Sequence, residues 1–116
     1  MDLLWDTARV NSFEQAASYA DRIEQELRGL GWWQSEPPPP SAFESRRAFY
    51  GDTMAFSQWL QFVLLARIRS IVAESGAFPA DSSVGSYAVR ELDGQDEAHA
   101  LIQVLIEFDQ FIKKLG

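Results

Sequence analysis

The residue types that most often carry out catalysis are scarce in this chain of 116 residues. There is one histidine, His99, and no cysteine. Metal sites inside four-helix bundles use Glu-x-x-His pairs, and the residue three positions before His99 is Asp96 rather than glutamate. A nucleophilic triad would need a serine on a sharp strand-to-helix turn, and the sequence carries no such pattern. We therefore expect no catalytic residues, no metal and no cofactor.

Two ionisable residues stand where apolar residues are expected. At about 100° per residue, Arg67 falls inside an apolar stripe of residues 55–74, and Asp109 falls inside one of residues 95–114. A buried charge needs a partner, and a guanidinium can bind a carboxylate through two hydrogen bonds. We therefore predict an Arg67–Asp109 ion pair between the two helices. Glu107 and Asp52 are the alternative partners of Arg67. Two other roles for Arg67 stay open: its side chain extends to the surface over its apolar stem, or it binds an anion or a protein partner.

The net charge of −7 also limits the function. Direct binding to nucleic acid is disfavoured because phosphate contacts need clustered lysine and arginine. No apolar run approaches the roughly 20 residues of a membrane span. The first residues are acidic, whereas a secretory signal begins with positive charge. We expect a soluble cytoplasmic protein that binds neither nucleic acid nor membrane directly.

Helical periodicity appears in four segments and strand alternation in none. We predict one domain over residues 1–116, an all-α antiparallel bundle of about four helices. The segment at 55–74 is apolar nearly all round, so we expect it in the middle, facing the last helix. Residues 1–11 are either a frayed arm or an extension of the first helix. The predicted helices cover residues 12–30, 55–74, 83–92 and 95–114.

A long loop rich in tryptophan and proline is predicted between the first two helices, over residues 32–51. Its four consecutive prolines favour an extended polyproline conformation. Two interpretations stay open: the aromatic residues hold the loop on the bundle, or the loop docks a partner, since tryptophan is common at interface hot spots. The candidate interaction surface consists of Trp32, Trp33, Pro37, Pro38 and Phe43.

The tryptophan pair, the four prolines and the block Asp52-Thr53-Met54-Ala55-Phe56-Ser57-Gln58-Trp59-Leu60-Gln61-Phe62 resemble the YqcC-like family of small bacterial proteins. The resemblance covers residues 16–115. The family commonly has a Pro-Arg pair after this block, whereas this chain has Ala66 before Arg67. The positions that match the family's recurring residues are Asp52, Thr53, Trp59, Gln61 and Arg67.

The resemblance implies a helical bundle with an accessory role beside a tRNA pseudouridine synthase, to which family naming and gene neighbourhood link such proteins. The leading interpretation is a non-catalytic bundle that binds a protein partner, an RNA-modifying enzyme by this resemblance; a homodimer also stays open. The first alternative is a domain that binds a small anionic ligand through Arg67, near Asp52. The second alternative is an enzyme of unrecognised type. A pocket converging on Arg67 and Gln61 would favour the ligand, and an exposed apolar patch around residues 32–43 would favour the partner.

Overall fold

The structure, a computed structural model, describes residues 3–115, with side chains from residue 11 onward. Within this part of the chain there are helices and no strands, which confirms the all-α prediction. The elements are α1 (Leu3–Gly29), η1 (Pro40–Glu44), η2 (Ala48–Tyr50), α2 (Phe56–Trp59), η3 (Leu60–Leu64), α3 (Leu65–Glu74), α4 (Val84–Glu91), η4 (Asp96–Ala98) and α5 (His99–Leu115).

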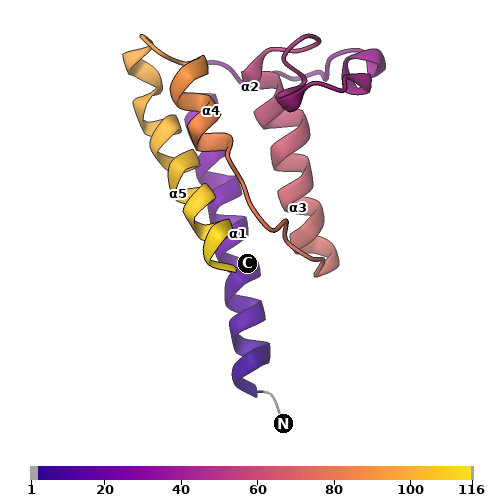
Figure 1. The fold of residues 1–116 in the computed structure, drawn as a ribbon, viewed down its shortest axis with the longest axis vertical. Coiled ribbons are helices and arrows are strands. Elements are labelled where there is room, and N and C mark those ends of the chain that lie inside the picture. The colour runs from indigo at the N-terminus through magenta and orange to yellow at the C-terminus, as the bar shows by residue number, and fades with distance from the viewer. Residues whose placement is uncertain (1–2, 116) are drawn as a thin grey trace.

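The central helix is α1, which packs against α3 on one side and α5 on the other, while α4 packs along α5 (Figure 1). The prediction that the helix at 55–74 lies in the middle and faces the last helix was wrong, because α1 packs against both α3 and α5 and takes the central place (Figure 1). The buried stripe of α1 begins with Ala16 and Ala20, both fully buried. Such small side chains let a neighbouring helix approach the α1 backbone closely.

The first helix begins at Leu3, so residues 3–11 extend α1, as one of the two alternatives for this segment predicted. Met1 and Asp2 lie outside the described residues. The helix stops where expected: Gly31 takes the left-handed conformation with φ of 75°. The Trp32 N–H donates to the carbonyl of Leu27 at 2.9 Å, and the Gly31 N–H to that of Arg28 at 3.0 Å. This is a Schellman motif, which satisfies two of the last carbonyls of the helix.

A π-helical turn, η3, interrupts the continuous helix made by α2 and α3. The Leu65 N–H donates to the carbonyl of Leu60, five residues back instead of four. The extra residue in this turn rotates every later side chain relative to a regular α-helix. The buried stripe therefore continues through Leu64, Leu65 and Ile68, and Arg67 is exposed. The regular 100° spacing, which placed Arg67 inside the stripe, does not hold across η3.

The close contact between α4 and α5 depends on Gly85, which lies in the first turn of α4 and is buried. A Cβ atom on Gly85 would lie 2.7 Å from both the Cα and the main-chain N of Ile106. It would also lie 2.9 Å from Oδ2 of Asp109. Glycine lowers helix propensity, but here only glycine lets the two backbones approach this closely.

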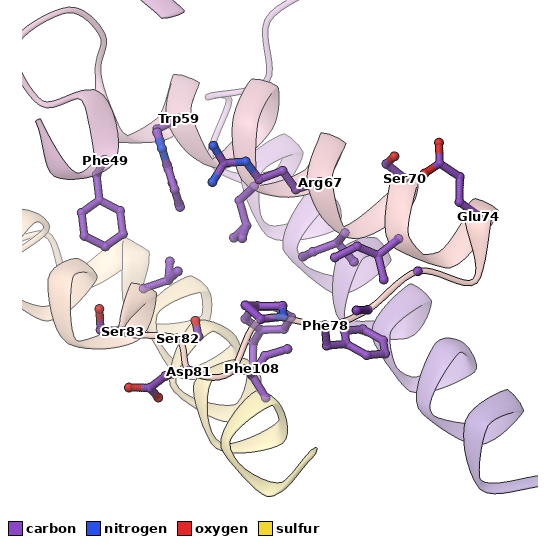
Figure 2. A pocket seen from close by; sticks show the side chains of 18 residues that line it. Phe49, Trp59, Arg67, Ser70, Glu74, Phe78, Asp81, Ser82, Ser83 and Phe108 are labelled. Atoms are coloured by element: carbon purple, nitrogen blue, oxygen red, sulfur yellow. The ribbon is translucent and has the colours of Figure 1, made fainter. Parts of the chain in front are cut away.

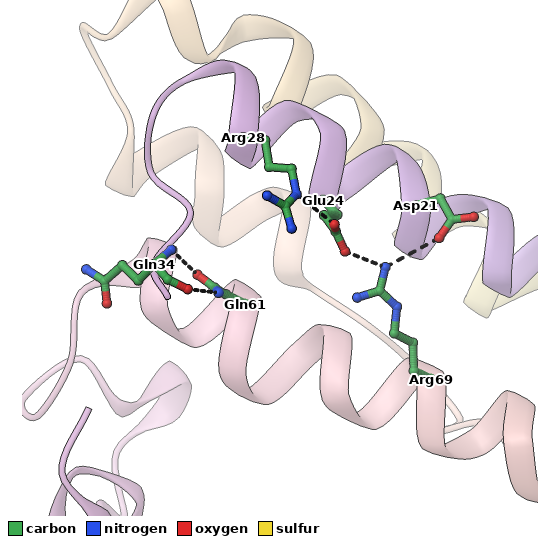
Figure 3. Close-up of polar contacts among 6 residues, drawn as sticks. All are labelled: Asp21, Glu24, Arg28, Gln34, Gln61 and Arg69. Atoms are coloured by element: carbon green, nitrogen blue, oxygen red, sulfur yellow. Dashed lines mark hydrogen bonds and ion pairs between the residues drawn. The ribbon is translucent and has the colours of Figure 1, made fainter. Parts of the chain in front are cut away.

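Ion pairs join α1 to both of its neighbours. Arg69 of α3 contacts Glu24 at 2.8 Å and Asp21 at 3.3 Å, both on α1 (Figure 3). Arg22 of α1 contacts Glu107 of α5 at 3.4 Å. Within α1, the Arg28 Nε–H donates to Oε2 of Glu24 at 2.8 Å. The hydrogen bond from Arg28, together with the hydrogen bond and charge of Arg69, lowers the pKa of the Glu24 carboxyl.

Replacing Gly85→Ala should lower the free energy of unfolding by about 1–3 kcal/mol, because the added methyl group overlaps the α5 backbone. Urea denaturation monitored by circular dichroism measures the change. The matched control is Gly29→Ala at the end of α1, where a Cβ atom meets nothing within 4 Å. That substitution should be neutral or stabilise the protein by up to about 1 kcal/mol. Equal effects of the two would contradict the close α4–α5 contact.

Replacing Glu24→Gln should reduce stability at neutral pH by at most about 1 kcal/mol, because this contact between α1 and α3 lies near the surface. The lowered pKa means that the folded state binds this proton more weakly than the unfolded state. The stabilising contribution is therefore fully present above the ordinary carboxyl pKa and is lost as the pH falls through the lower, folded-state value. The difference between wild type and variant, measured by thermal unfolding from pH 7 downward, should shrink in acid. A difference that grows in acid would contradict this assignment.

Candidate functional site

Gln61 holds the start of the long loop on the helix formed by α2, η3 and α3. The Gln34 N–H donates to Oε1 of Gln61 at 2.9 Å, and Nε2 of Gln61 donates to the Gln34 carbonyl at 2.7 Å (Figure 3). The Gln61 side chain therefore pairs with both main-chain groups of one residue, as a neighbouring β-strand would. It is buried, with 8% exposed. Its hydrogen bonds are used within the fold, so Gln61 has a structural role.

The loop residues predicted as an interaction surface fall into two groups. Trp32 and Trp33 are half-buried against the core, and the Arg28 guanidinium lies over the Trp33 ring, 4.4 Å from its centroid. Pro37 is exposed and Pro38 is half-buried. Phe43, in η1, is 37% exposed. The tryptophans thus hold the loop on the bundle, while Phe43 presents an apolar ring to the surface.

Hydrogen bonds close the later part of the loop on itself. Thr53 donates its Oγ1–H to the carbonyl of Ala42 at 2.7 Å. Asp52 accepts a hydrogen bond from the hydroxyl of Ser45. Together these two contacts bring residues 42–45 back to the start of α2, so Asp52 and Thr53 also serve the fold.

An aromatic cluster joins this loop to α2 and α4. The Phe49 ring lies 4.1 Å from that of Tyr87 and 4.8 Å from that of Trp59, centroid to centroid. Phe56 completes the cluster, 5.1 Å from Tyr87. Phe49 adopts a left-handed backbone conformation with φ of 57°, which is costly for an aromatic residue and persists here because three rings surround its own. Trp59, 6% exposed, is therefore a core residue.

The predicted Arg67–Asp109 ion pair is absent from the described residues, and Asp109 has a different role. Its Oδ1 accepts hydrogen bonds from the Ser82 hydroxyl at 2.6 Å and the Val84 N–H at 2.9 Å. Its Oδ2 accepts one from the Gly85 N–H at 2.7 Å. A carboxylate on α5 thus caps the N-terminus of α4, where main-chain N–H groups lack helical partners and the helix dipole favours negative charge. Within the described residues, Asp109 is therefore bound by a hydroxyl and two main-chain N–H groups and by no cation.

A cleft of about 660 Å³ separates α3 from α4 and α5 (Figure 2). Residues 76–83, which connect α3 to α4, run along it. Arg67 lies at its edge and makes no ion pair or hydrogen bond to another described residue. Arg67 lines the cleft and Gln61 does not, so this cleft is not the pocket converging on both residues that would have favoured a ligand. Its apolar lining is formed by Phe49, Trp59, Leu64, Ile68, Ile71, Ala77, Phe78, Pro79, Val84, Phe108 and Ile112.

Neither metal-binding clusters nor membrane spans are found in residues 3–115. No three His, Cys, Asp or Glu side chains gather there as a metal ion would require. None of the helices in this region combines the length and apolar character needed to cross a bilayer. His99 is exposed at the start of α5.

Three comparisons relate the chain to known proteins. A family model described as tRNA pseudouridine synthase C (DUF446) matches residues 15–111. An uncharacterized protein of Haemophilus influenzae is 25% identical over 83% of this chain and 91% of its own length. The uncharacterized protein YqcC of Escherichia coli is 31% identical over 73% of this chain and 78% of its own length. The similarity to the YqcC-like family noted in the sequence is thereby confirmed.

A solved structure supports the same fold. The solution NMR structure of YqcC from E. coli superimposes with a TM-score of 0.79 over 90% of this chain and 91% of that protein, at 24% identity. A third relative is longer: a protein of Pectobacterium carotovorum named tRNA pseudouridine synthase C is 40% identical over 57 residues. These residues make up 49% of this chain and 15% of that protein.

Replacing Asp109→Ala should lower the free energy of unfolding by roughly 2–4 kcal/mol, since it removes the cap of α4 and leaves the Ser82 hydroxyl without its acceptor. Replacing Arg67→Met should change it by less than about 0.5 kcal/mol, because the side chain is exposed. Chemical denaturation of both single variants and of the double variant measures these changes in the free energy of unfolding. The two effects should add. A large loss in Arg67→Met that Asp109→Ala rescues would instead restore the ion-pair hypothesis.

Proposed function

We propose that this chain, which belongs to the family described as tRNA pseudouridine synthase C (DUF446), is a non-catalytic accessory module that binds a tRNA pseudouridine synthase. The sequence similarity to the P. carotovorum protein of that name carries this proposal. The similar segment amounts to 15% of that protein, so a segment related to this chain is joined there to a much longer polypeptide. Segments that share one chain are held at high effective concentration, which favours a function exercised together.

The surface that suits such a partner surrounds Phe43. A shallow hollow of about 290 Å³ lies beside its ring, between η1, η2 and one side of the helix formed by η3 and α3. Exposed aromatic rings next to a hollow are typical of the anchor residues of an interface. We define the Phe43 patch as Phe43, Tyr50, Phe62, Val63 and Ala66, all of which line this hollow.

Charge complementarity supports the same class of partner. An enzyme that binds tRNA presents clustered lysine and arginine to the phosphates. This chain carries a net charge of −7. Opposite charges accelerate association and exclude partners of the same sign. An acidic module therefore suits a basic RNA-modifying enzyme better than it suits the RNA itself.

Replacing Phe43→Ser should weaken binding to the tRNA pseudouridine synthase of the same organism by about tenfold or more, because an apolar anchor of the interface is lost. Isothermal titration calorimetry with the two purified proteins measures the affinity. The association rate should also fall as salt is raised, since salt screens the attraction between unlike charges.

The matched control is Val89→Ser on α4. Val89 is 49% exposed and lies outside the Phe43 patch, so its replacement should leave the affinity unchanged. Circular dichroism of both variants establishes that each is folded. Absence of binding between the wild-type proteins would refute the proposed function. Equal weakening by the two substitutions would refute the Phe43 patch as the docking surface.

A further inference from the structure

The cleft between α3 and α5 is built from apolar walls with a cation at one edge. Both helices pack on α1, and the cleft lies between them. Its volume of about 660 Å³ falls within the usual range for small-molecule sites. Ile68 and Ile71 line it from α3, and Phe108 and Ile112 line it from α5. A ligand with an apolar body would displace water from these walls.

The charged side chains that line the cleft differ in direction and in whether they have an ion-pair partner. Figure 2 shows the guanidinium of Arg67, a lining residue, pointing toward Trp59. The carboxylates of Glu74 and Asp81, which also belong to the lining, point away from its centre in the same view (Figure 2). Arg69, two residues further along α3, is occupied by Asp21 and Glu24 of α1. Arg67 is thus a guanidinium that no carboxylate of the described residues neutralises.

We infer that this cleft is a binding site for a small amphiphile with an apolar body and one carboxylate, whose carboxylate pairs with Arg67. The planar guanidinium offers two parallel N–H donors, which match the two oxygens of a carboxylate. The apolar body lies between α3 and α5, against the rings of Phe78 and Phe108. A dicarboxylic ligand would lack such a fit, because the lining offers a single cation, and its second carboxylate would face Glu74, Asp81 or apolar surface.

Decanoate is the probe that tests the site, used below its critical micelle concentration. Isothermal titration calorimetry should show saturable binding to the wild-type protein. Arg67→Met should weaken decanoate binding by about 10- to 100-fold, the loss expected for a charge-assisted hydrogen-bonded pair. It should leave the binding of decan-1-ol, which lacks the charge, unchanged. Amide chemical shifts in the NMR spectrum should change at residues lining the cleft, among them Ile71 and Phe108.

The control variants separate a charge contact from a general change in the protein. Arg90→Met removes an exposed arginine in the last turn of α4, outside the cleft, and should leave decanoate binding unchanged. Arg67→Glu should abolish decanoate binding and create binding of decyltrimethylammonium. The inference is overturned by the absence of saturable decanoate binding, by equal affinity in wild type and Arg67→Met, or by shift changes confined to residues outside the cleft. Because this assay contains no synthase, its outcome is independent of the proposed partner.

Discussion

The arrangement of the second half of the chain depends on the carboxylate of Asp109. It accepts hydrogen bonds from Ser82, Val84 and Gly85, which end the connection from α3 and begin α4. This contact fixes where the connecting segment stops and how α4 lies on α5. It requires a glycine at position 85, because any side chain there would meet the α5 backbone. The cleft exists in its present shape because this segment is held to α5 rather than lying against α3.

The sequence predicted the helices well because their signals are local. Apolar spacing along α1 and α5, and Gly31 as a helix stop, depend on residues within a few turns of one another. The partners of Asp109 lie 24 to 27 residues away in the chain, and no local pattern points to them. The prediction that Arg67 lies inside the apolar stripe was wrong for a different reason. A single π-helical turn changes the direction of the side chains that follow it, and no particular residue type marks such a turn in the sequence.

The five positions that match the family's recurring residues have different roles in the structure. Asp52 and Thr53 close the long loop, Trp59 belongs to the aromatic cluster, and Gln61 holds the start of the loop. A sequence shows the residue types at these positions but not the direction of their side chains, so fold and function could not be separated there. Trp59 and Arg67 both line the cleft, and Arg67 is the one of the two that carries a charge. That charge is the reason for assigning a ligand to Arg67 and none to Gln61.

The way α3 is attached has a mechanical consequence. It packs along α1, while the cleft separates it from α5 (Figure 2). A rotation of α3 about its contacts with α1 would preserve those contacts, whereas a translation of α3 away from α1 would break them. The aromatic cluster above and the connecting segment below limit how far α3 can turn. A change in the width of the cleft would therefore disturb the contacts of the core less than a separation of α3 from α1 would.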